Sequence, residues 1–142
     1  MEIRLVEAEV VRPLRHAVLR PGATWDESVY PVDHLDDTLH LAVYDGDAVI
    51  GTATVFAEPH DGRPAWRLRG MAVADENRGQ GVGSRLLAEV VEQVRRQGAG
   101  LLWCNARTAA LPFYTRHGFT IVGEEFLAAH GVPHYLALLP LG

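Results

Sequence analysis

One glycine-rich segment, Arg78-Gly79-Gln80-Gly81-Val82-Gly83, constrains this chain more than any other feature. It stands between a predicted strand, residues 66–73, and a predicted helix that begins near Val82. Glycines at every second position remove the side chains that would keep a ligand away from the backbone. The loop amides and the unpaired N–H groups of the helix's first turn then form a site for an anion. The sequence therefore predicts a strand–loop–helix unit that binds a phosphate-bearing ligand.

Three kinds of phosphate loop compete for this segment. A P-loop ends in Gly-Lys-Ser/Thr, and no such lysine occurs here. A dinucleotide loop would place Ser84 where its third glycine belongs, and it expects an acidic residue roughly 20 positions further on. That position falls near Cys104 and Asn105, where there is no carboxylate, so a dinucleotide-binding oxidoreductase is disfavoured. The remaining pattern is Arg-x-x-Gly-x-Gly after a strand.

Length and composition indicate one domain over residues 1–142, close to the commonest domain size. The net charge of −5 gives no global electrostatic case for a nucleic-acid partner. No segment has the parts of a signal peptide, and no apolar run approaches the roughly 18 residues of a membrane span. The single cysteine, Cys104, excludes an internal disulfide and is compatible with a reducing cytoplasm. We therefore expect a cytoplasmic protein that binds neither membrane nor nucleic acid.

Predicted strands and helices alternate along the chain. Strands are expected over residues 3–6, 39–44, 48–56, 66–73, 101–104, 119–126 and 133–139, and helices over 10–19, 82–97 and 108–117. Pro13 is tolerable only in the opening turn of the first helix, and Thr108 can cap the third. The helix over 82–97 has the clearest apolar stripe, and Gly98 ends it. Residues 20–38 form a long irregular segment of the kind that binds a ligand or covers a site.

Together these features resemble the GNAT superfamily of N-acetyltransferases. Residues 68–73 are similar to its fourth strand, residues 78–84 to its pyrophosphate loop, and Ala110-x-x-Phe113-Tyr114-x-x-x-Gly118-Phe119 to its next signature. The resemblance covers about residues 66–123. It implies acetyl-coenzyme A as cosubstrate and an α/β (α+β) fold. In that fold a mixed, mostly antiparallel central sheet splays between strands 4 and 5, and about four helices flank it.

The same resemblance implies which residues contact the cofactor. They are Met71, Ala72, Val73, Arg78, Gly79, Gln80, Gly81, Val82, Gly83, Ser84, Asn105, Phe113 and Tyr114. Asn105 has a second interpretation of equal weight, as the cap of the helix that follows it.

Acetyl transfer to an amine needs a polarised carbonyl, a deprotonated amine and a stabilised leaving thiolate. The Val73 amide is the candidate for the first task and the Tyr114 hydroxyl, as general acid, for the third. Many members of the superfamily place a carboxylate on the fourth strand as base, whereas this chain has Arg67 and Arg69 there. The base is thus unassigned, His134 is one candidate, and the arginines suggest an acceptor with negative charge.

Other polar residues have structural interpretations. Cys104 is expected to be a buried small hydrophobe. His130 and His134 do not predict a metal site, because Gly131 and Pro133 between them argue against a helical pair. The acidic residues Asp33, Asp36 and Asp37 are expected to be solvated loop charges rather than amine ligands.

The sequence as a whole predicts an acetyl-coenzyme A-dependent N-acetyltransferase. It would act on a primary amine of a small molecule or peptide by direct transfer in a ternary complex, and a homodimer is compatible with it. Two alternatives stay open: a non-catalytic acyl-coenzyme A-binding regulatory domain, and the disfavoured dinucleotide-binding module.

Overall fold

The computed structural model describes all 142 residues, the side chain of Ala129 excepted. Seven strands are present: β1 (Glu2–Val6), β2 (Leu39–Asp45), β3 (Ala48–Ala57), β4 (Trp66–Val73), β5 (Leu101–Arg107), β6 (Thr120–Leu127) and β7 (Pro133–Pro140). The α-helices are α1 (Ala8–Leu19), α2 (Val82–Arg96) and α3 (Leu111–Arg116), and 3-10 turns occur at Trp25–Ser28, Asp75–Asn77, Thr108–Ala110 and Ala129–Gly131.

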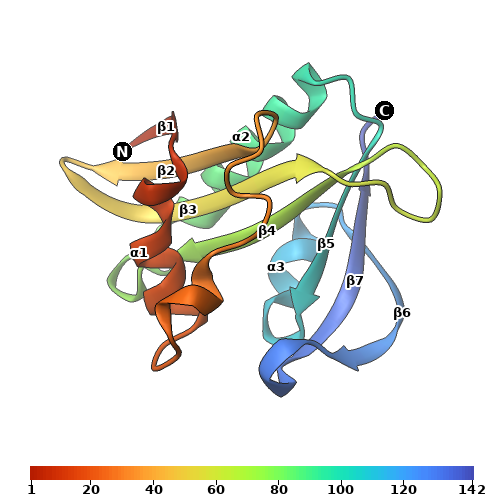
Figure 1. Ribbon diagram of the computed structural model, residues 1–142. Helices are drawn as coiled ribbons and strands as arrows, with labels where there is room; N and C mark the ends of the chain where they lie inside the picture. The colour runs from red at the N-terminus through yellow and green to blue at the C-terminus, as the bar shows by residue number, and fades with distance from the viewer.

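All seven strands form one sheet in the order β1-β2-β3-β4-β5-β7-β6. Every neighbouring pair is antiparallel except β4 and β5, which are parallel and pair only at Trp66↔Leu102 and Arg67↔Trp103. Beyond Arg67 the two strands diverge, as Figure 1 shows. The predicted mixed, mostly antiparallel sheet with a splay between strands 4 and 5 is confirmed.

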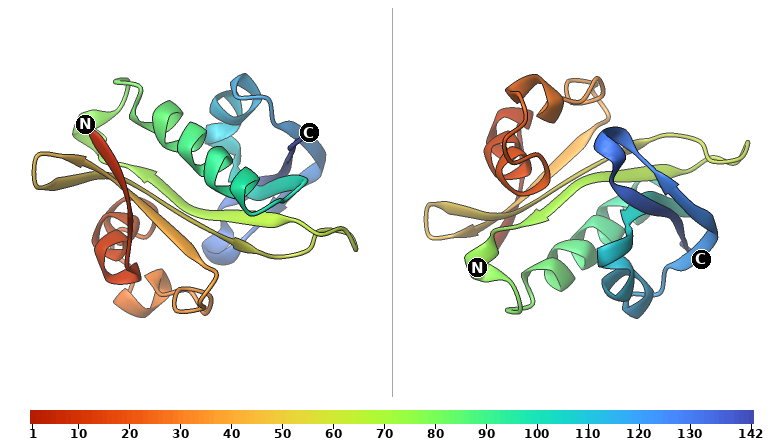
Figure 2. Two further views of the ribbon diagram at one scale, coloured as in Figure 1. Left: turned by 90° about the horizontal axis from the view of Figure 1, so that it is seen from above. Right: turned by 90° about the horizontal axis from the view of Figure 1, so that it is seen from below.

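Helices cover both faces of this sheet. Figure 2 shows α1 on one face and α2 and α3 on the other. The apolar stripe predicted for α2 is buried against the strands through Val82, Leu86, Leu87, Val90 and Val94. Truncating a large side chain in such a stripe costs about 2–5 kcal/mol. Because this packing fixes α2, it also fixes the loop at the helix's N-terminus.

Three details of the helices differ from the expectation. There are three α-helices rather than about four; residues 20–38, predicted to be irregular, contain only the 3-10 turn at 25–28. Helix α1 begins at Ala8, so Pro13 lies in its second turn instead of its first. Thr108 does not cap α3: its hydroxyl donates to the Glu125 carboxylate at 2.7 Å.

A buried ion pair holds the irregular segment 20–38 against the sheet. The Arg15 guanidinium, on α1, donates to both Asp33 carboxylate oxygens at 2.9 and 3.1 Å and to the Thr54 hydroxyl at 2.7 Å. Asp33 is 3 % exposed, so its prediction as a solvated loop charge is wrong, whereas Asp36 and Asp37 are exposed. Burial alone would raise the pKa of Asp33, but the hydrogen bonds from Arg15 and the Tyr30 amide outweigh it and lower that pKa.

Candidate active site

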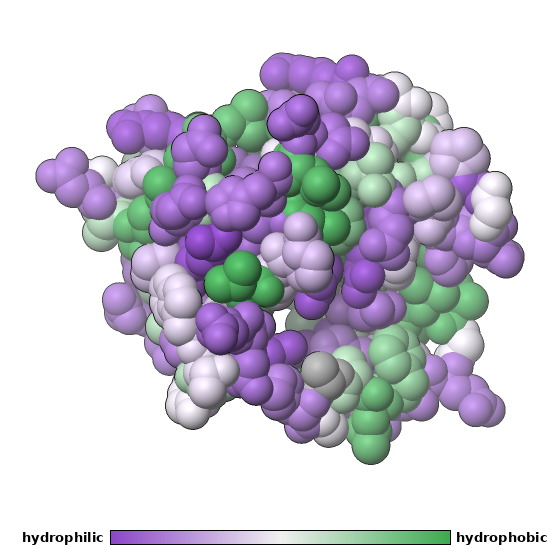
Figure 3. Space-filling view, viewed as in Figure 1, coloured by the Kyte–Doolittle hydropathy of each residue, from purple (hydrophilic) through white to green (hydrophobic). Residues whose placement is uncertain are grey.

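Two cavities meet on the face of the molecule where β4 and β5 diverge. The first, about 580 Å³, follows the glycine loop and is called here the loop groove; Val73, Arg78, Gly79, Gly81, Ser84 and Phe113 line it. The second, about 290 Å³, is called the arginine cavity; Arg20, Arg67, Arg69, Arg107, Asn105 and His134 line it. Met71, Ala110 and Tyr114 border both. Figure 3 shows a hollow on this side of the molecule with mainly hydrophilic residues around it.

The loop groove ends at the N-terminus of α2. Gly79 and Gly81 have φ of +76° and +79°, a left-handed conformation that favours glycine, and a side chain at either position would meet nothing within 4 Å. The first helical hydrogen bond runs from the Arg85 amide to the Gly81 carbonyl, so the three preceding amides have no partner inside the helix. No acidic residue lies in this first turn. The loop therefore presents backbone donors and a positive helix end to an anion.

Three of the residues predicted to bind the cofactor at this loop also make contacts within the protein, and one of them, Gln80, lies outside the groove. Gly83 is helical, and a Cβ there would lie 3.3 Å from the Phe113 ring, so this glycine permits close packing. The Gln80 side chain hydrogen-bonds Asn77 and the Glu76 carbonyl and does not line the groove. The Arg78 side chain is exposed and pairs with Asp75 at 3.1 Å.

The free edge of β4 forms one wall of the site. The Ala74 amide donates to the Ile50 carbonyl of β3 at 2.9 Å. Because amides alternate sides along a strand, the Val73 amide faces away from β3, toward the splay where β5 does not pair. Met71, two residues earlier, shares that direction. Gly70 makes a bulge just before it: its φ is +63°, and a Cβ would come within 3.0 Å of Arg15.

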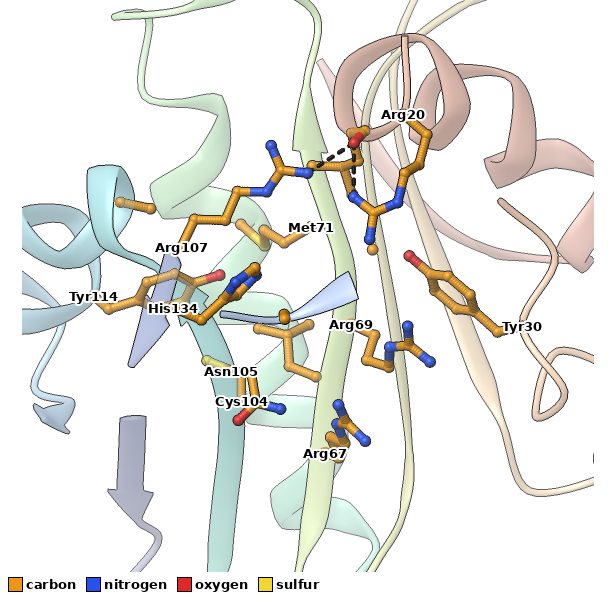
Figure 4. Close-up of a pocket in the computed structure, with 15 residues that line it drawn as sticks. Arg20, Tyr30, Arg67, Arg69, Met71, Cys104, Asn105, Arg107, Tyr114 and His134 are labelled. Atoms are coloured by element: carbon orange, nitrogen blue, oxygen red, sulfur yellow. Dashed lines mark hydrogen bonds between the residues drawn. The ribbon is translucent and has the colours of Figure 1, made fainter. Parts of the chain in front are cut away.

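Tyr114 stands at the junction of the two cavities. The residue is 7 % exposed, and its ring makes edge contacts with Phe113 and Phe119, which fix the direction of the ring. Figure 4 shows the hydroxyl turned toward the cavity. Burial first, and then the neighbouring Cys104, raise the pKa of Tyr114 well above its usual value, so the phenol keeps its proton at neutral pH. Burial also raises the pKa of the Cys104 thiol to about 12.

His134 lies on β7 and lines the arginine cavity, as Figure 4 shows. Its Nδ1 is 2.7 Å from the Val132 carbonyl, which can only accept a hydrogen bond. Nδ1 therefore carries a hydrogen, and in the neutral ring Nε2 has the free lone pair. Asn105 lines the same cavity and not the loop groove, and the helix that follows it has no side-chain cap.

Four arginines converge on the second cavity. Arg67 and Arg69 lie there from β4, while Arg20 and Arg107 come from the end of α1 and the end of β5. Sequence reasoning missed Arg20, Tyr30 and Arg107. The spacing of Arg107 from Asn105 offered one indication, because residues two apart on a strand share a face.

Comparison with known proteins identifies the family. Residues 36–121 match the model of the acetyltransferase (GNAT) domain. The chain is also 30% identical over 129 residues to the uncharacterized N-acetyltransferase YitI of Bacillus subtilis, covering 89% of this chain and 87% of that protein. The chain belongs to the GNAT family of acetyltransferases.

Solved structures agree with this fold. Escherichia coli ElaA superimposes with a TM-score of 0.81 at 18% identity, covering 96% of this chain and 97% of that one. An aminoglycoside 6'-N-acetyltransferase complexed with coenzyme A gives a TM-score of 0.74 at 17% identity, covering 99% and 97%. At these identities the likeness concerns the fold alone.

Proposed function

We propose that this protein transfers an acetyl group from acetyl-coenzyme A to a primary amine of a small molecule or peptide, directly and within a ternary complex. The observation that carries the proposal is the junction of the two cavities at Met71 and Tyr114. One cavity has the features of a phosphate site and the other has room for an acceptor. A proton donor stands between them.

The loop groove would hold the cofactor. Backbone amides from Gly79 to Ser84 would bind its pyrophosphate, which suits a helix N-terminus without an acidic residue. The outward amides of Met71 and Val73 would pair with the pantetheine arm along the free edge of β4. The acetyl thioester would then lie near Tyr114, and the Val73 amide is the candidate to polarise its carbonyl.

Each chemical task has a candidate residue at this junction or in one of the two cavities that meet there. Acetyl-coenzyme A supplies the activated acetyl group, and the amine nitrogen forms the new C–N bond as the C–S bond breaks. The Tyr114 hydroxyl would give its proton to the departing sulfur. His134 Nε2, whose lone pair is free when Nδ1 donates to Val132, would take the proton that the amine loses.

Direct transfer fits better than an acyl-enzyme. Cys104 is the only cysteine, it is 2 % exposed, and burial raises its pKa to about 12, so little thiolate forms at neutral pH. A catalytic function also explains the second cavity and the buried hydroxyl of Tyr114. A domain that only binds an acyl-coenzyme A would need neither.

Release of coenzyme A thiol tests the proposal. Acetyl-coenzyme A with a broad panel of amines should give thiol release that depends on the amine, with one acetylated amine per thiol. Tight binding of acetyl-coenzyme A without any amine-dependent release would instead support the non-catalytic alternative. Thermal stabilisation by NAD and not by coenzyme A would indicate the dinucleotide alternative.

A further inference from the structure

The arginine cavity has an unusual charge. Arg20, Arg67, Arg69 and Arg107 line it, and no aspartate or glutamate does among the residues that the structure describes. An arginine side chain stays protonated throughout the physiological range. An amine acceptor that enters this space is itself a potential cation, so the cavity would repel it unless it brings negative charge.

Two of these arginines are held close together, and neither pairs with a carboxylate among the described residues. Arg107 and Arg20 donate to the same Leu19 carbonyl oxygen, at 2.7 and 2.8 Å, as the dashed lines in Figure 4 show. The two donor nitrogens, Nη2 of Arg107 and Nη1 of Arg20, therefore lie within two hydrogen-bond lengths of each other. Each guanidinium has further N–H donors, and the carbonyl oxygen, with only a partial negative charge, neutralises neither group. Such a pair matches the oxygens of a phosphate or carboxylate.

The two arginines of β4 are not equivalent. The Arg67 guanidinium pairs with Glu58 at 3.3 Å and lies over the Trp103 ring, so its charge is partly compensated. Arg69 has no carboxylate partner among the described residues. Its guanidinium lies 3.9 Å from the centroid of the Tyr30 ring, which orients the group without neutralising it.

A second arginine lies against the Tyr30 ring. The Arg15 guanidinium also lies 3.9 Å from its ring centroid, and Arg15 is anchored by the buried Asp33. The ring that orients Arg69 is therefore part of the rigid packing between α1 and the sheet. Because this packing holds the Arg69 guanidinium in place, we interpret Arg69 as a binding group rather than as a freely solvated surface charge.

We propose that the acceptor is an amine carrying two or more negative charges, as one phosphate group or as two carboxylates. The Arg20–Arg107 pair binds the phosphate or one of the carboxylates, and Arg69 faces the remaining negative charge, while the amine lies toward Tyr114. This inference rests on the proposed acetyl transfer and specifies its acceptor. The cofactor's own pyrophosphate is accounted for separately, because the glycine loop lies in the other cavity.

Matched pairs of acceptors test the proposal. Serine is compared with O-phosphoserine, and asparagine with aspartate, with spermidine as a polycation. Thiol release from acetyl-coenzyme A gives the kcat/KM ratio within each pair, and calorimetry gives binding of each compound to the coenzyme A-saturated protein. The variants are Arg20→Gln and Arg107→Gln, which keep an N–H donor for Leu19. Arg95→Gln, on the exposed last turn of α2, is the control.

The anionic member of at least one pair should be preferred at least tenfold, and added salt should weaken the preference. Arg107→Gln and Arg20→Gln should each reduce that preference roughly 10- to 100-fold, the usual range for a hydrogen bond to a charged group. Arg95→Gln should leave it unchanged, and none of the three should alter acetyl-coenzyme A affinity. If the preference for the anionic compound is larger in the serine pair, the acceptor carries a phosphate. If it is larger in the asparagine pair, the acceptor carries two carboxylates.

Two further outcomes separate this inference from the proposed function. If neutral amines or spermidine are acetylated best, or Arg107→Gln leaves the preference unaltered, acetyl transfer stands and the anionic acceptor is wrong. If no compound accelerates thiol release but an anionic one binds in an Arg107-dependent manner, the anion site stands and the transfer proposal fails. Failure of both anionic compounds to bind overturns the inference in either case.

Discussion

Gly83 lies against the ring of Phe113, close enough that a Cβ would meet it at 3.3 Å. This contact joins the N-terminus of α2 to α3, and so links the glycine loop to the helix that carries Tyr114. A substitution at Gly83 would disturb this packing as well as any bound phosphate. The loop's anion site is better tested at Gly79, where a side chain would enter open space.

Gly79→Asp and Gly79→Asn form a matched pair for that test. Both side chains tolerate the left-handed backbone better than other residues do, and they differ only by a charge. We expect the aspartate variant to bind acetyl-coenzyme A at least tenfold more weakly than the asparagine variant, because its carboxylate faces the pyrophosphate. Calorimetry on both folded variants measures this. Equal affinities would contradict an anion site at the loop.

The buried network beside residues 20–38 makes a prediction about pH. His40 Nε2 is 2.9 Å from the Asp33 carbonyl, so it must donate, and Nδ1 accepts from the Thr54 hydroxyl at 2.8 Å. This arrangement uses the neutral ring. Burial lowers the pKa of His40 below its ordinary value of about 6.5, despite the opposing effect of Asp33.

As the pH falls below about 6.5, the unfolded chain gains a proton at this histidine that the folded chain binds only at lower pH, so stability falls. The loss should be on the order of 1 kcal/mol between pH 7 and pH 5. Urea unfolding at the two pH values should show a smaller loss in His40→Asn, even if that variant is less stable at pH 7. The contribution of Asp33, whose pKa is lowered, disappears only at more acidic pH. Identical pH dependence in the variant would contradict the neutral assignment.

His134→Asn tests the proposed base. The asparagine amide can still donate to the Val132 carbonyl, but nothing replaces the lone pair of Nε2. We expect kcat to fall about 10²–10⁴-fold with little change in acetyl-coenzyme A affinity. Partial recovery with added imidazole would identify the missing group as a base. Wild-type kcat in the variant would leave His134 with a structural role.

Local patterns predicted the parts of the site that come from one segment. The glycine loop, β4 and α2 follow from turn chemistry and periodicity, and the family resemblance placed Tyr114 on the following helix. The arginine cavity could not be predicted in full, because α1, β4 and β5 bring its arginines together only in the folded sheet. Asp33 was misjudged for the same reason: its partner lies on another element. Arg15 does share the buried stripe of Ala8 and Val11, and that spacing was an available indication.

The sequence also makes predictions about membrane association, location and assembly. No helix of the described residues has the length and apolar character to cross a membrane. The homodimer and the cytoplasmic location stay predictions.

The rate of thiol release by Tyr114→Phe tests the central claim most directly. The variant keeps the ring contacts with Phe113 and Phe119 and loses only the hydroxyl at the junction of the two cavities. Under single-turnover conditions, with acetyl-coenzyme A and acceptor both bound, we expect release to slow about 10²–10⁴-fold while cofactor affinity changes little. Release at the wild-type rate would contradict the assignment of the chemical step to Tyr114.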